Sequence, residues 1–155
     1  MSYKRIVVPV DGSDTSAKGL AAATALARDS GGKLLLLHVV DEYPAFITPE
    51  IGVSVGPLIE ALRETGRQTL ERIAAGVKGL AAAPESALVE NFGGRVADVI
   101  VEEALKWQAD LIVMGTHGRR GVNRALVGSD AELVVRYSPL PVLLVPPAGR
   151  AVPAR

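Results

Sequence analysis

The sequence predicts an α/β fold built around a buried parallel sheet. Five short apolar runs alternate with longer stretches rich in alanine and leucine, which is the pattern of repeated strand-helix-strand units. The second and fourth of these runs are nearly continuous, as expected for strands of a buried parallel sheet. In such a doubly wound sheet, ligands lie beyond the carboxyl ends of the strands, where the strand order reverses.

The first half of the chain is predicted to hold two strands, two helices and a long loop. Ser13 or Asp14 can cap the first helix, and Gly31 with Gly32 can stop it. The segment after the second strand has two prolines, two glycines and no hydrophobic period, which is typical of a functional loop. The expected elements are a strand over 5–10, a helix to about residue 30, a strand over 33–40, a loop over 41–56 and a helix from 57 to about 82.

The second half is predicted to complete a single domain. Its expected elements are a strand over 86–91, a helix over 96–108, a strand over 110–114, a helix over 129–137 and a strand over 142–145. Two prolines close the last strand, and we expect one domain over 1–147 with a flexible tail over 148–155.

A glycine-rich loop after the fourth strand carries the strongest functional signal. Gly115-Thr116-His117-Gly118 begins where the apolar run 111–114 ends, and Gly128-Ser129 follows after nine residues. Glycine lets a phosphate approach the backbone, and amides near a helix N-terminus present partial positive charge to an anion. Nucleotide binding is therefore the leading hypothesis, and a Gly-x-x-Gly formed by chance is the alternative.

Two further segments are expected at the same edge of the sheet. Asp11-Gly12-Ser13 follows the first strand, and residues 39–41 follow the second. Asp11 is either a ligand for a ribose hydroxyl or a phosphate-bound cation, or a turn or capping carboxylate. Gly12 is best interpreted as a turn residue.

Other side chains near the glycine loop have two interpretations each. The Ser129 hydroxyl can donate to a phosphate or cap the following helix, and both roles can hold together. His117 either contacts phosphate or is simply exposed in the loop. The arginines that either neutralise phosphate or form a solvated basic loop are Arg119, Arg120 and Arg124.

Composition excludes several function classes. Lys plus Arg and Asp plus Glu both number 17, so a general affinity for nucleic acid or anionic membrane is not expected. There is no cysteine, and the two histidines are far apart, so neither a disulfide nor a His-based metal site is predicted. No apolar run is long enough to span a bilayer, and no signal segment is evident at the N-terminus. We expect a soluble, cytoplasmic protein.

Taken together, these motifs resemble the universal stress protein family. The ATP-binding signature of that family is glycine, two residues, glycine, nine residues, then glycine followed by serine or threonine. Gly115, Gly118, Gly128 and Ser129 satisfy all of it. The segments that carry the resemblance extend over nearly the whole chain and are 6–13, 37–40, 110–118, 128–132 and 141–145.

The resemblance implies a Rossmann-like fold of the adenine nucleotide alpha hydrolase type, with a five-stranded parallel sheet and helices on both faces. It also implies a homodimer joined through the last strand, here Val142-Val145. An apolar edge strand would otherwise be exposed, so pairing across a two-fold axis is physically reasonable.

The same resemblance implies an ATP site. Asp11 and the backbone near Val40 would hold the ribose and adenine, with Gly115 close to the ribose, while Gly128 and Ser129, with Gly118, would hold the phosphates. Mg²⁺ or Mn²⁺ would accompany the phosphates, with Asp11 as the candidate metal ligand. The expected nucleotide-binding residues are Pro9, Val10, Asp11, Gly12, Ser13, Val39, Val40, Met114, Gly115, Thr116, His117, Gly118, Arg119, Arg120, Gly128, Ser129 and Asp130.

Asp130 departs from the family pattern, in which this position is more often small or apolar. Its carboxylate would either repel a triphosphate or help to hold a divalent cation.

The leading functional hypothesis is an ATP-binding protein that couples nucleotide occupancy to stress signalling, with slow hydrolysis at most, because no residue stands out as a positioned general base. One alternative is a dimeric interaction module that needs no nucleotide. Another is an ATP-hydrolysing or adenylate-forming enzyme. The related ATP pyrophosphatases carry Ser-Gly-Gly-x-Asp-Ser after the first strand, and the segment from Asp11 to Ser16 keeps only the glycine and the last serine. The protein partners remain unknown from sequence.

Overall fold

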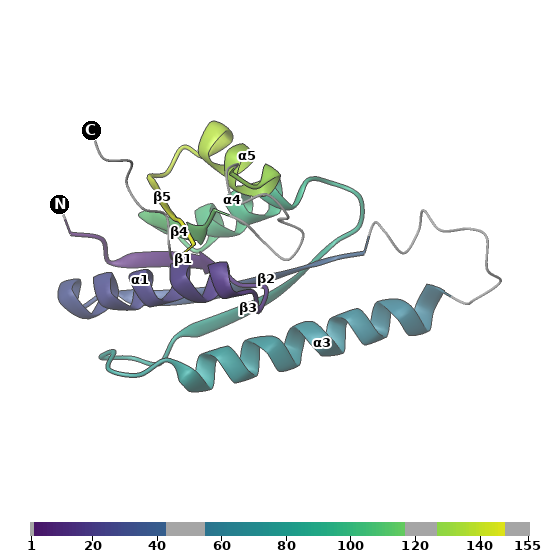
Figure 1. The fold of residues 1–155 in the computed structure, drawn as a ribbon, viewed down its shortest axis with the longest axis horizontal. Coiled ribbons are helices and arrows are strands. Elements are labelled where there is room, and N and C mark those ends of the chain that lie inside the picture. Colours follow the sequence, from purple (N-terminus) through teal and green to yellow (C-terminus); the bar gives the residue numbers. More distant parts are fainter. Residues whose placement is uncertain (1, 43–54, 117–126, 148–155) are drawn as a thin grey trace.

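Five parallel strands form the centre of the computed structural model, which describes residues 2–42, 55–116 and 127–147 (Figure 1). The strand order is β3-β2-β1-β4-β5, so the predicted five-stranded parallel sheet is confirmed. The strands are β1 (Arg5–Pro9), β2 (Lys33–Asp41), β3 (Glu85–Asn91), β4 (Leu111–Gly115) and β5 (Val142–Val145). The helices are α1 (Asp14–Ser30), α3 (Val55–Gly76), α4 (Val96–Lys106) and α5 (Ser129–Tyr137).

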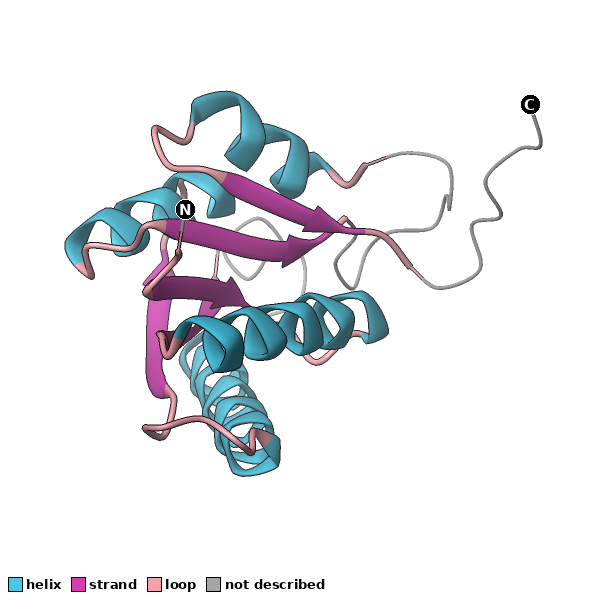
Figure 2. Cartoon of the chain, turned by 90° about the vertical axis from the view of Figure 1, so that its left-hand side faces the viewer, coloured by secondary structure: helices cyan, strands magenta, loops and turns pink. Residues whose placement is uncertain are grey.

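Helices cover both faces of the sheet, as Figures 1 and 2 show. Ile6 and Val8 of β1 pack toward α1 and α3, whereas Val7 between them packs toward α4 and α5. All three side chains are fully buried, because successive residues of a strand point to opposite faces and both faces are covered. This two-sided burial explains why the central strands are continuous apolar runs.

The strand order reverses at β1, which lies between β2 and β4. The chain leaves β1 toward α1 on one face, and α5, which follows β4 in the element order, lies on the other face. A crevice at the carboxyl ends of β1 and β4 is the expected result of this divergence. The fold therefore places the segments after β1, β2 and β4 at one edge of the sheet.

The ends of α1 follow the expected chemistry. The Ser13 hydroxyl accepts a hydrogen bond from Ser16 N, and Gly31 ends the helix with a φ of 65°. Ser13, not Asp14, is therefore the cap.

Two helices end earlier than predicted. The helix expected from 57 to about 82 spans Val55–Gly76, and Gly79 beyond it has a φ of 77°, which is incompatible with a right-handed helix. The helix expected over 96–108 ends at Lys106, because Gln108 also takes a left-handed conformation, with a φ of 56°. The other predicted strands and helices agree with the structure within one or two residues. Residues 43–54 of the predicted loop and the predicted tail over 148–155 lie outside the described residues.

Within the described ranges, no helix is long and apolar enough to cross a membrane.

Candidate functional site

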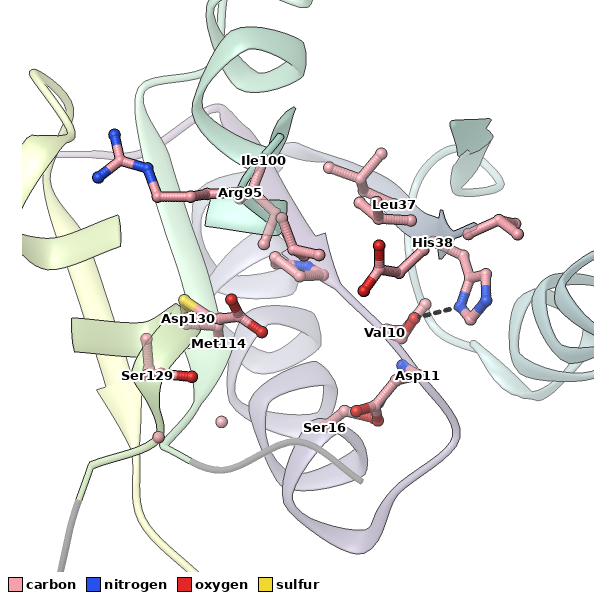
Figure 3. A pocket seen from close by; sticks show the side chains of 18 of the residues that line it. Val10, Asp11, Ser16, Leu37, His38, Arg95, Ile100, Met114, Ser129 and Asp130 are labelled. Carbon is pink, nitrogen blue, oxygen red and sulfur yellow. Dashed lines mark hydrogen bonds between the residues drawn. The ribbon is translucent and has the colours of Figure 1, made fainter. Parts of the chain in front are cut away.

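A cavity of about 560 Å³ opens at the carboxyl edge of the sheet (Figure 3). Its size suits a small-molecule ligand. The cavity walls come from the ends of β1, β2 and β4, from the N-terminal turns of α4 and α5, and from the middle of α3. The lining residues are Pro9, Val10, Asp11, Ser16, Leu37, His38, Val39, Val40, Asp41, Leu62, Thr65, Gly66, Gly94, Arg95, Val96, Ile100, Met114, Gly115, Thr116, Gly128, Ser129, Asp130, Ala131 and Leu133.

A network of short-range hydrogen bonds shapes the turn after β1. The Asp11 carboxylate accepts from Ser13 N at 2.9 Å, and Ser13 Oγ accepts from Ser16 N at 3.2 Å. Ser16 Oγ donates to Ser13 O at 3.1 Å and accepts from Asp11 N at 3.4 Å. Asp11 thus makes the turn bond expected of a structural aspartate while its side chain still lines the cavity. The two interpretations of Asp11 are compatible.

His38 links the ends of β1 and β2 through a side-chain hydrogen bond. Its Nδ1 lies 2.7 Å from Val10 O, as the dashed line in Figure 3 marks. On its other side the imidazole packs against α3, where a Cβ added to Gly66 would lie 2.8 Å from His38 Cδ2. This bond accommodates the polar imidazole near the end of β2.

The start of α5 faces the cavity from the opposite side. Gly128 N donates to Thr116 O at 2.6 Å, which fastens the helix start to the end of β4. The N-cap of α5 is Gly128, and no side chain caps the helix. The alternative in which Ser129 caps this helix was therefore wrong, because Ser129 is its first helical residue. Ser129 and Asp130 are both exposed and line the cavity.

The glycine at position 115 is required by packing against α1. A Cβ added to Gly115 would lie 2.5 Å from Thr15 O, which is closer than any real Cβ contact. The residue lines the cavity as well. Its small size is explained by the close approach of α1 to β4, so the glycine by itself says little about a ligand.

The start of α4 contributes a cation that the sequence motifs did not reveal. Arg95 lines the cavity, and its guanidinium donates to both Asp98 carboxylate oxygens at 2.8 and 3.0 Å. The guanidinium also lies 4.8 Å from the centre of the Tyr137 ring. The hydrogen bond with Asp98 is the main reason that the pKa of Arg95 is raised. The pair Gly93-Gly94 before the helix was the one signal in the sequence that could have drawn attention to this turn.

Most predicted site residues come together in this cavity. Gly12 and Ser13 do not line it: Gly12 has a φ of 81° in the turn, and Ser13 caps α1. His117, Gly118, Arg119 and Arg120 lie outside the described residues, as does Arg124. The predicted residues that line the cavity are Pro9, Val10, Asp11, Val39, Val40, Met114, Gly115, Thr116, Gly128, Ser129 and Asp130. Sequence reasoning missed the wall formed by α3 and α4, because nothing local in those helices marks them as neighbours of the strand ends.

Metal ligation by the protein alone is not supported in the part of the chain that the structure describes. No group of three or more histidine, aspartate or glutamate side chains there could hold a metal ion. Asp11 lines the cavity from the turn after β1, Asp41 from the end of β2 and Asp130 from the start of α5. A divalent cation near Asp11 would therefore need ligands from a bound phosphate.

The family model described as the universal stress protein family matches residues 2–146. The chain belongs to this family. A universal stress protein of Methanocaldococcus jannaschii is 37% identical over 143 residues, which cover 92% of this chain and 82% of the relative. The solved structure of a universal stress protein family member from Burkholderia pseudomallei is 36% identical, covers 93% of this chain and 96% of its own, and superposes with a TM-score of 0.75.

Two solved universal stress proteins contain adenine nucleotides. One, in complex with cAMP, is 26% identical, covers 96% of this chain and 100% of its own, and has a TM-score of 0.57. The other, from Archaeoglobus fulgidus in complex with dAMP, is 27% identical, covers 93% of this chain and 98% of its own, and has a TM-score of 0.62. Nucleotide binding by structural neighbours is in line with the predicted ligand class.

Proposed function

We propose that this universal stress protein binds ATP in the cavity at the carboxyl edge of its sheet and acts as a nucleotide-dependent regulator in the stress response. The observation that carries the proposal is that two helices, α4 and α5, begin at this cavity without a side-chain cap. Amides at a helix N-terminus present partial positive charge, and the helix dipole favours an anion there. By contrast, α1 has its cap in Ser13.

The phosphates would lie against the start of α5. The Ser129 hydroxyl and the amides of the first turn supply donors, and Gly128 lets the phosphates approach the backbone. The glycine signature also includes Gly118, which by the family pattern would contact the same phosphates.

The adenosine would lie between the ends of β1 and β2. The Asp11 carboxylate is a candidate acceptor for a ribose hydroxyl, and the backbone at Val39 and Val40 is the candidate partner of the base. Apolar side chains of Leu37 and Ile100 line the same cavity and would pack on the adenine. The complexes of the structural neighbours with cAMP and dAMP support this ligand class.

The residues of the cavity favour binding of ATP without efficient hydrolysis. The carboxylates of Asp11, Asp41 and Asp130 are the acidic side chains that line the cavity in the described residues, and Asp11 already accepts the turn bond from Ser13 N. Mg²⁺ or Mn²⁺ would accompany the phosphates with Asp11 as its nearest protein ligand, and a cation there lowers the charge repulsion that ATP would meet. Hydrolysis would be slow at most.

Calorimetric titration with ATP, ADP and AMP, with and without Mg²⁺, tests the proposal. We expect ATP to bind the wild-type protein, and we expect Gly118→Leu to abolish binding because the side chain fills the space that the phosphates would occupy. Gly76→Leu is the matched control, since an added Cβ at Gly76 meets no atom within 4 Å. A folded wild-type dimer that binds no nucleotide would favour the nucleotide-independent interaction module instead.

A turnover assay on the same protein separates a regulator from an enzyme. We expect ATP to remain largely intact over many binding lifetimes. Rapid multiple turnover would support the ATP-hydrolysing alternative.

We also propose that the protein is a homodimer joined through β5. This strand forms one edge of the sheet, and Leu143 on it is 39% exposed. An exposed apolar edge strand is protected when a second copy pairs with it.

A further inference from the structure

We infer that His38 is a positioning residue of the nucleotide site, because its imidazole sets the orientation of the Val10-Asp11 peptide and so aims the Asp11 carboxylate. This inference rests on the proposed function, in which Asp11 accepts a hydrogen bond from the ribose. His38 itself is not required to touch the nucleotide.

The hydrogen bond of His38 lies where the pairing of β1 with β2 ends. Pro9 opposite Leu37 is the last pair in the register, and Val10 N still donates to Leu37 O at 2.8 Å. The carbonyl oxygen just beyond the end of β1, Val10 O, lies 2.7 Å from His38 Nδ1. The side chain thus occupies the acceptor that a further backbone bond between the strands would use.

This bond holds one side of a peptide whose other side is also held. The Val10 carbonyl and the Asp11 amide belong to the same planar unit, so fixing both ends fixes its rotation. Asp11 N donates to Ser16 Oγ at 3.4 Å, which is a long bond, whereas the His38 bond at 2.7 Å is short. Of these two bonds on the Val10-Asp11 peptide, the one from His38 is the shorter.

The chemistry of a carbonyl determines the tautomer of His38. A carbonyl oxygen only accepts hydrogen bonds, so Nδ1 must carry the proton. In the neutral imidazole, Nε2 is then the unprotonated nitrogen. The tautomer of His38 can therefore be observed by NMR without any bound nucleotide.

Helix α3 holds the ring in place from the other side. A Cβ added to Gly66 would lie 2.8 Å from His38 Cδ2 and 3.1 Å from Nε2, so even alanine would displace the ring. Leu62, Thr65 and Gly66 of α3 line the cavity as well. The position of α3 is in this way linked through His38 to the turn that carries Asp11.

Long-range ¹H–¹⁵N correlation spectra of the free full-length protein, in a weakly alkaline buffer, test the tautomer. We expect the His38 resonances to show a protonated Nδ1 and a bare Nε2, with assignment by their loss in His38→Asn. A neutral ring protonated at Nε2 would overturn the proposal.

Binding of ATP and of its 2′,3′-dideoxy analogue tests the positioning. We expect the wild type to bind the ribonucleotide more tightly than the dideoxy analogue. In His38→Leu, which has no donor, the ratio of the two dissociation constants should shrink roughly tenfold. His38→Asn, whose amide can donate near the place of Nδ1, should restore much of it. Gly66→Ala should lower the preference by displacing the ring, whereas Gly76→Ala should leave it unchanged.

Leu88→Ala is the control for a merely structural effect. Leu88 also lies against Gly66, with Cδ1 2.9 Å from the position of an added Cβ, but it is apolar. This variant should lower the free energy of unfolding without changing the preference for ribose. If His38→Leu kept that preference while the wild type showed it, the positioning role would be overturned and ATP binding would stand. A wild type that bound no adenine nucleotide would instead overturn the proposed function and the positioning role that rests on it.

Discussion

Gly19 of α1 lies directly against Gly115 of β4: a Cβ added to Gly19 would be 3.0 Å from Gly115 N. The approach is closer still from the side of β4, since a Cβ on Gly115 would be 2.5 Å from Thr15 O of α1. Two glycines thus allow α1 to pack on the backbone of β4. This packing brings Ser16, in the first turn of α1, to the same cavity as the end of β4.

Gly115→Ala should destabilise the protein strongly. The added methyl overlaps a backbone oxygen that cannot move without shifting α1, so we expect the free energy of unfolding to fall by about 2 kcal/mol. Urea denaturation followed by circular dichroism measures the change. Gly76→Ala is the matched control and should be neutral or stabilising by about 0.5 kcal/mol, because its site is open and the residue is helical. Equal stability of Gly115→Ala and wild type would show that α1 and β4 tolerate a wider spacing.

Arg63→Met should destabilise the fold through the buried Glu42. The Glu42 side chain is fully buried, its Oε1 accepts from Arg63 Nε at 3.2 Å, and its Oε2 has no hydrogen-bond partner in the described part of the chain. Removing the guanidinium leaves a buried carboxylate without its cation, which lowers the free energy of unfolding. Thermal and urea unfolding measure this loss.

Arg67→Met is the control for that prediction. Arg67 lies one turn further along α3, is 54% exposed, and pairs with Glu64 and Glu71 on the helix surface. Surface pairs of this kind contribute little to stability, so we expect only a small loss. If the two arginine variants lost the same stability, burial of Glu42 would not be the cause. Adding Glu42→Gln to Arg63→Met should recover part of the loss, because the uncompensated charge is removed.

Asp130→Asn should strengthen the binding of ATP in the absence of divalent cations. The carboxylate lies in the first turn of α5, where the proposed phosphates would bind, and like charges repel. We expect the dissociation constant of metal-free ATP to fall about threefold, with a smaller change for AMP. Calorimetry with EDTA present measures both.

Glu132→Gln is the matched control in the same turn, since Glu132 pairs with Arg136 and does not line the cavity. If Asp130→Asn weakened ATP binding only when Mg²⁺ is present, the alternative role of Asp130 in holding a cation would be favoured.

Leu143→Lys should weaken the proposed dimer. A lysine on the edge strand would place its charge against the partner copy, so we expect the dissociation constant of the dimer to rise roughly tenfold or more. Sedimentation equilibrium measures the association. Ser86→Lys on β3, the opposite edge of the sheet, should leave the association unchanged. A wild-type monomer at high concentration would contradict the proposed dimer directly.

Local features of the sequence predicted the elements well, for reasons that are visible in the structure. The run from Leu34 to Leu37 is continuous because both faces of β2 are covered, and Ser13 and Gly31 end α1 through their own side-chain and backbone chemistry. The end of α3 was predicted too late in the chain. Gly76, where the helix ends, is itself helical, and Gly79 beyond it is the glycine with a left-handed backbone. Nothing in the local pattern distinguished the two glycines.

The sequence by itself therefore determined the succession of strands and helices, the family and the three strand ends that meet at the cavity. Only the tertiary structure decided that Gly66 and Arg95 form its walls, that His38 bonds to Val10 O, and that Gly115 is small because of α1. The physical reason is the sequence separation over which each kind of interaction acts. Apolar periodicity and capping act within a few residues, whereas the contacts of His38 with Val10 and Gly66 join residues 28 positions apart on either side and exist only once the sheet has formed.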